Sequence, residues 1–260
     1  MVIIGEKINA TRKKIAAALE ARDARAIIQA AAEQADAGAD YLDLNGGDPR
    51  EGRETKNMEW LIGLVQEHTD LPVAVDSANP EAVEVGLSKA RKKPILNSIS
   101  LEQDRLDPLL PLVGKHECMV VALLMSDGGT PHGVDDRVQN AEKLIGRLTS
   151  AGKEIDEIIV DPCFLPISVD PASGRAVVDA IAAIRAKWPE LHIGGGLSNI
   201  SYGLPQRRCV NLAALAQCIY AGMDYAIVDP CMEGIVSTIL AAEALAGRDE
   251  FCMNYVMRMR

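Results

Sequence analysis

Short apolar runs alternate with amphipathic helical segments along the whole of this 260-residue chain. About eight such units follow one another, which is the number in a (β/α)8 barrel, a fold of ~250 residues. The apolar runs are continuous, as expected of parallel strands that helices cover on both faces. The predicted strands are Val2–Gly5, Tyr41–Asn45, Pro72–Asp76, Pro94–Ser98, Met119–Met125, Ile158–Asp161, His192–Leu197 and Tyr225–Asp229.

The segments between the strands have helical periodicity. Ala24–Ala37 and Val134–Ala151 carry apolar residues at helical spacing, and a last helix over Met232–Ala246 ends before Gly247, a residue suited to a helix C-terminus. No linker rich in Gly, Pro or Ser divides the chain. We therefore predict an α/β fold with a single domain over residues 1–260, a TIM (β/α)8 barrel. A doubly wound open sheet has the same alternation and is the alternative architecture.

The composition excludes some classes of protein. The chain carries 27 Lys and Arg against 37 Asp and Glu, a net charge of −10, and has only two Trp, five Tyr and two Phe. A nucleic-acid binder would instead have a basic face with aromatic stacking platforms. No apolar stretch approaches the ~18 residues of a membrane helix, and the N-terminus lacks the apolar core of a signal peptide. Six scattered cysteines without a Cys-x-x-Cys pair predict a cytoplasmic protein with reduced thiols.

Several predicted strands end in a carboxylate or carboxamide residue. In a barrel these ends converge on the C-terminal mouth, where active sites lie. Helix capping would explain any one of them, but it does not require this uniformity. The polar residues at or just after strand ends are Asn9, Asp43, Asn45, Asp76, Asn97, Asp161, Ser198, Asn199 and Asp229.

Such a mouth suits a pterin, because a carboxylate accepts two adjacent N–H groups and a carboxamide supplies one donor and one acceptor. A nucleophile–histidine–acid set is not apparent, and only His132, in a loop, follows a strand end. Gly194–Gly196 is either a phosphate-binding turn or a closely packed glycine strand. Lys7 is more consistent with a surface cation than with a Schiff-base lysine.

Two near-identical tetrapeptides, Val160–Cys163 and Val228–Cys231, end two of the predicted strands. A zinc site would need a further thiol or imidazole at a fixed spacing, and the sequence offers none. We therefore predict packed thiols at Cys163 and Cys231 and no resident metal.

The motifs at the strand ends resemble one known family. They are I-I-G-E-K-I-N near the N-terminus, L-D-L-N at Leu42–Asn45, V-D-S at Val75–Ser77, L-N-S at Leu96–Ser98, V-D-P at Val160–Pro162 and G-G-L-S-N-I-S at Gly195–Ser201. In this order, over essentially the whole chain, they look like a methyltetrahydrofolate:corrinoid methyltransferase. That pterin-binding barrel is also the folate module of cobalamin-dependent methionine synthase.

The resemblance implies roles for individual residues. Asp76, Asn97 and Asp161 would hold the pterin ring, and Asn199 would reach the pterin N5, where the methyl group sits. An arginine near the ligand in relatives corresponds to Arg207, although the doubled Arg207–Arg208 leaves the register open by one residue. The other polar strand ends that we expect to contact substrate are Asp43, Asn9 and Ser198.

The resemblance also implies an activity, transfer of a methyl group between a corrinoid protein and N5 of tetrahydrofolate, and a homodimer. We expect methylcorrinoid to be the donor and tetrahydrofolate the acceptor, in the catabolism of a methyl donor such as glycine betaine. Transfer to a corrinoid iron–sulfur protein in acetyl-CoA synthesis, aryl-ether demethylation, dihydropteroate synthesis, a silent folate carrier and a phosphate-using lyase or isomerase are the alternatives. The cobalamin would arrive on a partner protein, because no cobalamin-binding motif is present.

Overall fold

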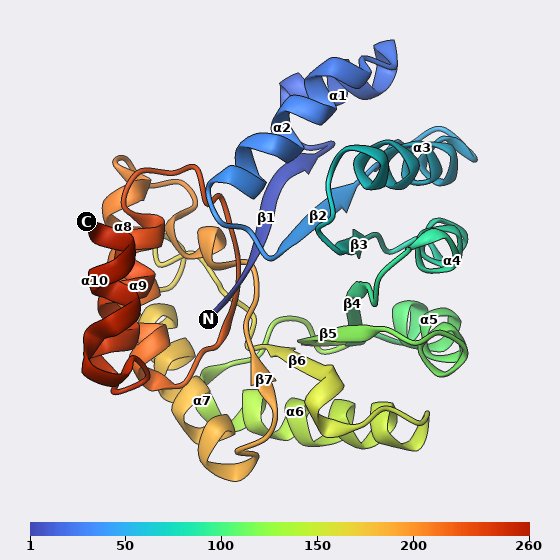
Figure 1. Ribbon diagram of the computed structural model, residues 1–260. Coiled ribbons are helices and arrows are strands. Elements are labelled where there is room, and N and C mark those ends of the chain that lie inside the picture. The colour runs from blue at the N-terminus through green and yellow to red at the C-terminus, as the bar shows by residue number, and fades with distance from the viewer.

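Eight parallel strands form one sheet in the computed structural model, which describes residues 1–260, and helices surround this sheet (Figure 1). The strand order is β7-β6-β5-β4-β3-β2-β1-β8, so every strand except β7 and β8 lies beside its sequence neighbours. The strands are β1 (Val2–Asn9), β2 (Tyr41–Asn45), β3 (Val73–Asp76), β4 (Ile95–Leu101), β5 (Met119–Ser126), β6 (Ile158–Asp161), β7 (His192–Ile193) and β8 (Tyr225–Val228).

The two ends of the sheet meet and close it into a barrel. A parallel bridge joins Gly196 to Ile227, and the Ile227 N–H donates to the Gly195 carbonyl at 3.0 Å. The Asp224 N–H donates in the same way to the Ile193 carbonyl at 3.0 Å. The predicted single-domain TIM barrel is thus confirmed, and the open doubly wound sheet is excluded.

One or more helices follow each strand. The α-helices are α1 (Lys13–Ala21), α2 (Ala24–Asp36), α3 (Arg53–His68), α4 (Pro80–Lys89), α5 (Gln103–Lys115), α6 (Gly133–Ser150), α7 (Ser173–Lys187), α8 (Arg207–Ala221), α9 (Ile235–Leu245) and α10 (Met253–Met259). The short 3-10 helices are η1 (Ile155–Glu157), η2 (Leu197–Ser201) and η3 (Glu250–Cys252).

Local sequence explains several helix boundaries. The Asp23 side chain caps α2 by accepting from the Ala26 N–H, and Asn79 caps α4 in the same way with Pro80 in its first turn. Gly247 follows α9 with φ near +72°, as its predicted place after the last helix requires. The predicted α2, α6 and α9 are therefore present, with ends shifted by three residues or fewer.

The barrel interior is a separate apolar cluster. A larger core fills the space between the strands and the surrounding helices. The interior cluster takes one or two inward-pointing side chains from each of six strands, and where a strand gives two they are two residues apart, because alternate residues of a strand point to opposite faces. Its members are Ile4, Ala74, Ile95, Met119, Val121, Ile159, Tyr225 and Ile227.

Three predicted strands have the wrong extent, and one of them is β4, which continues three residues past the predicted Ser98 to Leu101. β1 continues four residues past the predicted Gly5 to Asn9, so it passes through Glu6 and Lys7. β7 ends at Ile193 instead of the predicted Leu197, because the chain bends at the three glycines and Leu197 begins η2. Of the two alternatives for Gly194–Gly196, the structure favours the close packing, since these glycines make the contact that closes the barrel.

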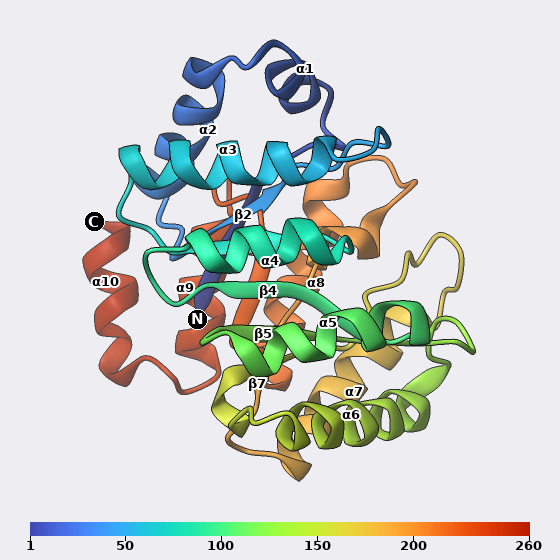
Figure 2. The same cartoon turned by 90° about the vertical axis from the view of Figure 1, so that its right-hand side faces the viewer.

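The C-terminal segment lies outside the barrel. α10 packs beside α9 on the side of the molecule where the N-terminus also lies (Figure 2). Phe251 is 86% exposed and Met257 is 64% exposed, so this segment leaves an apolar surface uncovered. No helix of the structure combines the length and apolar character that a membrane crossing requires.

The barrel closure predicts the effect of a methyl group at Gly194. A Cβ there would lie 2.3 Å from the Tyr225 carbonyl oxygen, which belongs to the backbone of β8 and cannot turn aside. We expect Gly194→Ala to lower the free energy of unfolding by about 3 kcal/mol. Gly63→Ala, in α3 with open space around it, is the matched control and should raise stability by up to ~1 kcal/mol. Urea unfolding of both variants tests this, and wild-type stability of Gly194→Ala would contradict the tight closure.

Candidate functional site at the barrel mouth

The barrel interior changes from apolar to polar one layer above the apolar cluster. On β1, β3, β4, β5 and β6, the residue in this layer lies two positions after a buried interior residue, as the period of a strand requires. For β1, for example, Val2 and Ile4 point inward and the next inward residue is Glu6. The inward residues of this layer are Glu6, Asp43, Asp76, Asn97, Leu123, Asp161 and Gly196.

A cavity of about 380 Å³ lies on this polar layer. It is at the small end of the ~300–1,000 Å³ range of ligand sites, which suits one flat ring system. Only two of its lining residues are hydrophobic. The lining residues are Glu6, Asn9, Thr11, Arg12, Asp43, Asp76, Asn97, Ser98, Leu123, Asp161, Gly196, Ser198, Asn199 and Ile227.

Carboxamides hold the two carboxyls on β2 and β3. Asn97 donates from Nδ2 to Asp43 Oδ1 at 3.0 Å. Asn45 and Asn9 both donate to Asp76 Oδ2, at 3.1 and 3.3 Å. The Asn97 side-chain oxygen and the second Asp76 oxygen accept no hydrogen bond within the protein, so both are left to meet a ligand in the cavity.

Burial raises the pKa of both carboxyls. Asp43 is only 2% exposed, and the neighbouring Asp76 carboxylate raises the Asp43 pKa further, well above its ordinary value. Burial also raises the pKa of Asp76 to about 6, although the Asn45 hydrogen bond opposes this. Two adjacent buried carboxyls do not both ionise readily, so Asp43 keeps its proton at a pH where Asp76 has lost its own.

Asp161, across the cavity on β6, is held by backbone donors instead. Its two oxygens accept from the Cys163 N–H at 2.8 Å and the Gly196 N–H at 3.2 Å. Burial raises its pKa to about 6 despite these hydrogen bonds. A Cβ on Gly195 would lie 2.1 Å from the Asp161 carboxyl, so this glycine makes room for the carboxyl group.

The η2 turn carries Ser198 and Asn199 to the rim of the cavity. Ser198 donates from Oγ to Glu6 Oε1 at 3.3 Å. Asn199 is exposed at the rim, and its side chain makes no hydrogen bond within the protein. Arg207 does not line the cavity; it donates to the Ser201 hydroxyl at 3.0 Å and to the Ser198 carbonyl at 2.6 Å. Its observed contacts therefore brace the turn that presents Asn199.

Sequence reasoning missed Glu6 and Arg12. Arg12 contacts Glu6 at 2.9 Å and Asp229 at 3.6 Å, and burial raises the pKa of Glu6 against this opposing charge. Glu6 could have been found by continuing the alternation of Val2 and Ile4, but the predicted strand ended one residue before it. Arg12 lies beyond the strand, and no pattern in the sequence points to it.

The residues named from the sequence divide into two groups. Asn9, Asp43, Asp76, Asn97, Asp161, Ser198 and Asn199 all line one cavity. Outside it lie Asn45, which donates to Asp76, and Asp229, which contacts Arg12. His132, the residue before α6, also lies outside it.

Lys7 pairs with Glu33 at 2.6 Å on the outer side of β1, away from the cavity. Of the two predicted packed thiols, Cys163 is buried, whereas Cys231 is exposed and contacts the Glu33 carbonyl. Nowhere does the structure gather three or more His, Cys, Asp or Glu side chains in a position to hold a metal ion.

The chemistry of the cavity is that of an acceptor-rich edge facing an apolar surface. Asp76 and Asp161 offer carboxylate oxygens, Asn97 offers an amide oxygen, and Leu123 and Ile227 supply the apolar contact. A flat heterocycle with several N–H groups along one edge would satisfy both parts.

A barrel with such a cavity at its C-terminal mouth has the architecture of an enzyme for a small flat substrate. The family model described as pterin binding enzyme matches residues 5–229, a range that contains every residue of the cavity. The chain therefore belongs to the pterin-binding enzymes.

Two kinds of curated relatives match. A methylcorrinoid:tetrahydrofolate methyltransferase of Eubacterium limosum is 32% identical over all of this chain and 96% of that protein. A methionine synthase of Mycobacterium leprae is 30% identical over 88% of this chain, but the match spans only 20% of that protein. The resemblance inferred from the strand-end motifs is thus confirmed.

Solved structures of dihydropteroate synthases share the fold. One from Coxiella burnetii, in complex with pteroic acid, has a TM-score of 0.72 at 16% identity over 95% of this chain and 92% of that one. Another from Vibrio fischeri has the same TM-score at 15% identity, over 95% of this chain and 93% of that one. At this identity the likeness extends to the fold alone.

The buried Asp43 predicts a stability that depends on pH. Its folded pKa lies above its unfolded value, so its contribution to stability is present in acid and is lost as the pH rises. Asp43→Asn keeps the acceptor for Asn97 and removes the group whose ionisation the folded state disfavours. We expect the variant to be more stable than wild type at pH 8, by about 1.4 kcal/mol for each unit of pKa shift, and equal to it near pH 4.

Thermal or urea unfolding at the two pH values measures this difference. Asp156→Asn, at an exposed carboxylate without a hydrogen-bond partner, is the control and should show no such pH-dependent gain. A less stable Asp43→Asn at pH 8 would contradict the burial argument.

Proposed function

We propose that the mouth cavity binds the pterin ring of tetrahydrofolate and that the enzyme transfers a methyl group between N5 of that ring and a corrinoid. The single observation that carries the proposal is the acceptor-rich layer in which Asp76, Asn97 and Asp161 surround a cavity of about 380 Å³. A pterin presents its 2-amino and ring N–H groups to such a layer. The similarity to a methylcorrinoid:tetrahydrofolate methyltransferase supports the methyl transfer.

In the proposed direction, the N5 lone pair forms a bond to the methyl carbon, the cobalt–carbon bond breaks with its electron pair left on cobalt, and N5 loses its proton. Asn199 stands at the rim without another partner, and its amide oxygen can accept a hydrogen bond from N5–H. A carboxamide has no pKa near neutral pH and cannot act as a general base, so Asn199 orients N5 and the proton leaves to solvent.

A separate protein presents the corrinoid in this proposal. The cavity accommodates one ring system and its rim is open, so a partner carrying the methyl group approaches from above Asn199. For the physiological setting we propose the catabolism of a methylated donor such as glycine betaine, with methylcorrinoid as the methyl source. Finding this enzyme's activity with a corrinoid iron–sulfur protein instead would favour acetyl-CoA synthesis.

We also propose that the protein works as a homodimer in the cytoplasm. The exposed apolar residues near the C-terminus support the dimer, and the six free cysteines are consistent with a reducing compartment. The apolar surface comprises Tyr220, Leu245, Phe251, Met253 and Met257.

The role of Asn199 can be tested by its removal. We expect Asn199→Ala to lower the single-turnover rate of methyl transfer from methylcobalamin to tetrahydrofolate by on the order of 10²-fold, because N5 loses its oriented acceptor. The rate is measured from the change in the absorption spectrum of the cobalamin as it loses its methyl group. Asn254→Ala, at an exposed carboxamide on α10, is the control. An unchanged rate for Asn199→Ala would remove this residue from the reaction.

Pterin affinity should depend on pH through Asp76 and Asp161. The pKa of each is about 6 in the free protein, and ring N–H groups bind the ionised form. Binding therefore weakens as the pH falls below about 6, by up to tenfold per pH unit for each carboxyl. Calorimetry with a tetrahydropterin at pH 7.5 and 5.0 should show this loss, and binding at pH 6 should release protons to the buffer. Equal affinity at both pH values would refute this recognition, and no binding at any pH would refute the pterin assignment.

A further inference from the structure

A second and larger hollow of about 520 Å³ lies between α1, α2 and the outer side of β1. Four of its nine lining residues are cationic, which is unusual on a chain with a net charge of −10. Its lining residues are Lys7, Arg12, Lys13, Lys14, Ile15, Ala26, Gln29, Ala30 and Glu33. We call it the cationic pocket.

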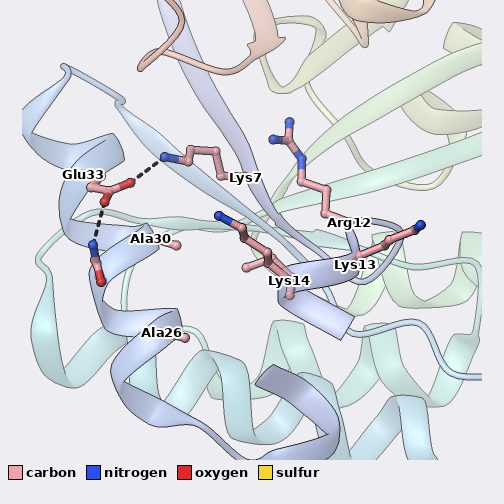
Figure 3. A pocket seen from close by; sticks show the side chains of 9 residues that line it. Lys7, Arg12, Lys13, Lys14, Ala26, Ala30 and Glu33 are labelled. Carbon is pink, nitrogen blue, oxygen red and sulfur yellow. Dashed lines mark hydrogen bonds and ion pairs between the residues drawn. The ribbon is translucent and has the colours of Figure 1, made fainter. Parts of the chain in front are cut away.

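The cationic pocket adjoins the mouth cavity, because Arg12 lines both. Figure 3 shows the ends of Lys7 and Lys14 directed toward α2, whereas the Arg12 guanidinium points away from α2 and Lys13 extends to the opposite side. A ligand group that leaves the mouth past Arg12 therefore meets further positive charge.

The lysines differ in how far their charge is already neutralised. Lys7 pairs with Glu33 at 2.6 Å, and Glu33 also accepts from Gln29 at 3.0 Å. Lys14 has no carboxylate partner, unlike lysines on other helices such as Lys115 and Lys187, which pair with Glu84 and Glu142. Lys14 is thus a cation at the rim of a hollow with its charge available to an anion.

The floor of the cationic pocket is apolar. Ile15, Ala26 and Ala30 contribute small or branched hydrocarbon side chains to the lining beside the cationic residues. A ligand that alternates methylene groups with carboxylates would bury the former on this floor and place the latter against the cations.

We propose that the cationic pocket binds the glutamyl tail of the folate whose ring occupies the mouth cavity, and that it selects folates with several linked glutamates. This inference rests on the proposed function of the mouth. The tail fits better than a protein surface because the pocket is a hollow that shares Arg12 with the ring site. The carboxylates of the tail would pair with Lys14, which has no carboxylate partner within the chain.

Calorimetry with three ligands at low salt tests the proposal. They are 6-methyltetrahydropterin, which has no tail, and tetrahydrofolate with one or five glutamates. We expect the pentaglutamate to bind wild type about tenfold more tightly than the monoglutamate, a preference of the size that a few exposed ion pairs supply. The preference should shrink at 0.5 M salt, where such charges are screened.

Lys14→Gln should lose most of this preference and Lys14→Glu should abolish it, while both keep wild-type affinity for 6-methyltetrahydropterin. Lys143→Gln, at an exposed lysine of α6 without an ion pair, is the matched control and should keep the preference. A wild type without the preference, or a Lys14→Gln that retains it, would overturn the inference.

Two further outcomes separate this inference from the function on which it rests. Failure of 6-methyltetrahydropterin to bind wild type would contradict the pterin site itself. Normal binding of all three ligands by Lys14→Gln, combined with slower methyl transfer from a corrinoid protein only, would overturn the tail site in favour of protein docking there.

Discussion

The burial of three carboxyl groups inside the barrel is the constraint on which the rest of the site depends. No salt bridge reaches Asp43, Asp76 or Asp161, although all three lie in the polar layer of the interior. A desolvated carboxylate is costly unless N–H groups donate to it. Carboxamides from other strands and the backbone N–H groups of Cys163 and Gly196 supply those donors. The three carboxyl groups are therefore fixed in place before any ligand arrives.

The same burial links stability to binding. In the free protein the raised pKa values of Asp76 and Asp161 mean that ionisation near neutral pH costs folding energy. A ligand with N–H groups recovers part of that energy, because it supplies the donors that water would otherwise provide. The barrel is thus less stable than one with apolar residues in place of these carboxyl groups. Part of the lost stability is regained on binding, which raises the affinity for a ring with the matching hydrogen-bonding pattern.

Much of the fold and site follows from local sequence patterns. The continuous apolar runs predict the strands, and the polar strand ends predict seven lining residues, because strand period and barrel geometry are local rules. Glu6 was missed because a charged residue interrupts the apolar run from which β1 is predicted. The short β7 and the contacts of Arg207 depend on segments that are distant in the sequence, such as the Tyr225 backbone that packs against Gly194. A local sequence pattern does not contain that information.

The two adjacent hollows have opposite electrostatic character, and Arg12 separates them. Its guanidinium contacts Glu6 at 2.9 Å and lies 3.6 Å from Asp229, so its two carboxylate partners are both on the mouth side. The carboxyls of the mouth therefore do not neutralise Lys14, which faces the other hollow. Exposed charges are screened within about 10 Å at ordinary salt, so the charges of one hollow act weakly on the other. The affinity for a ring and the affinity for an anionic chain can therefore change independently in one enzyme. A single barrel can in this way combine a selective ring site with a salt-sensitive site beside it.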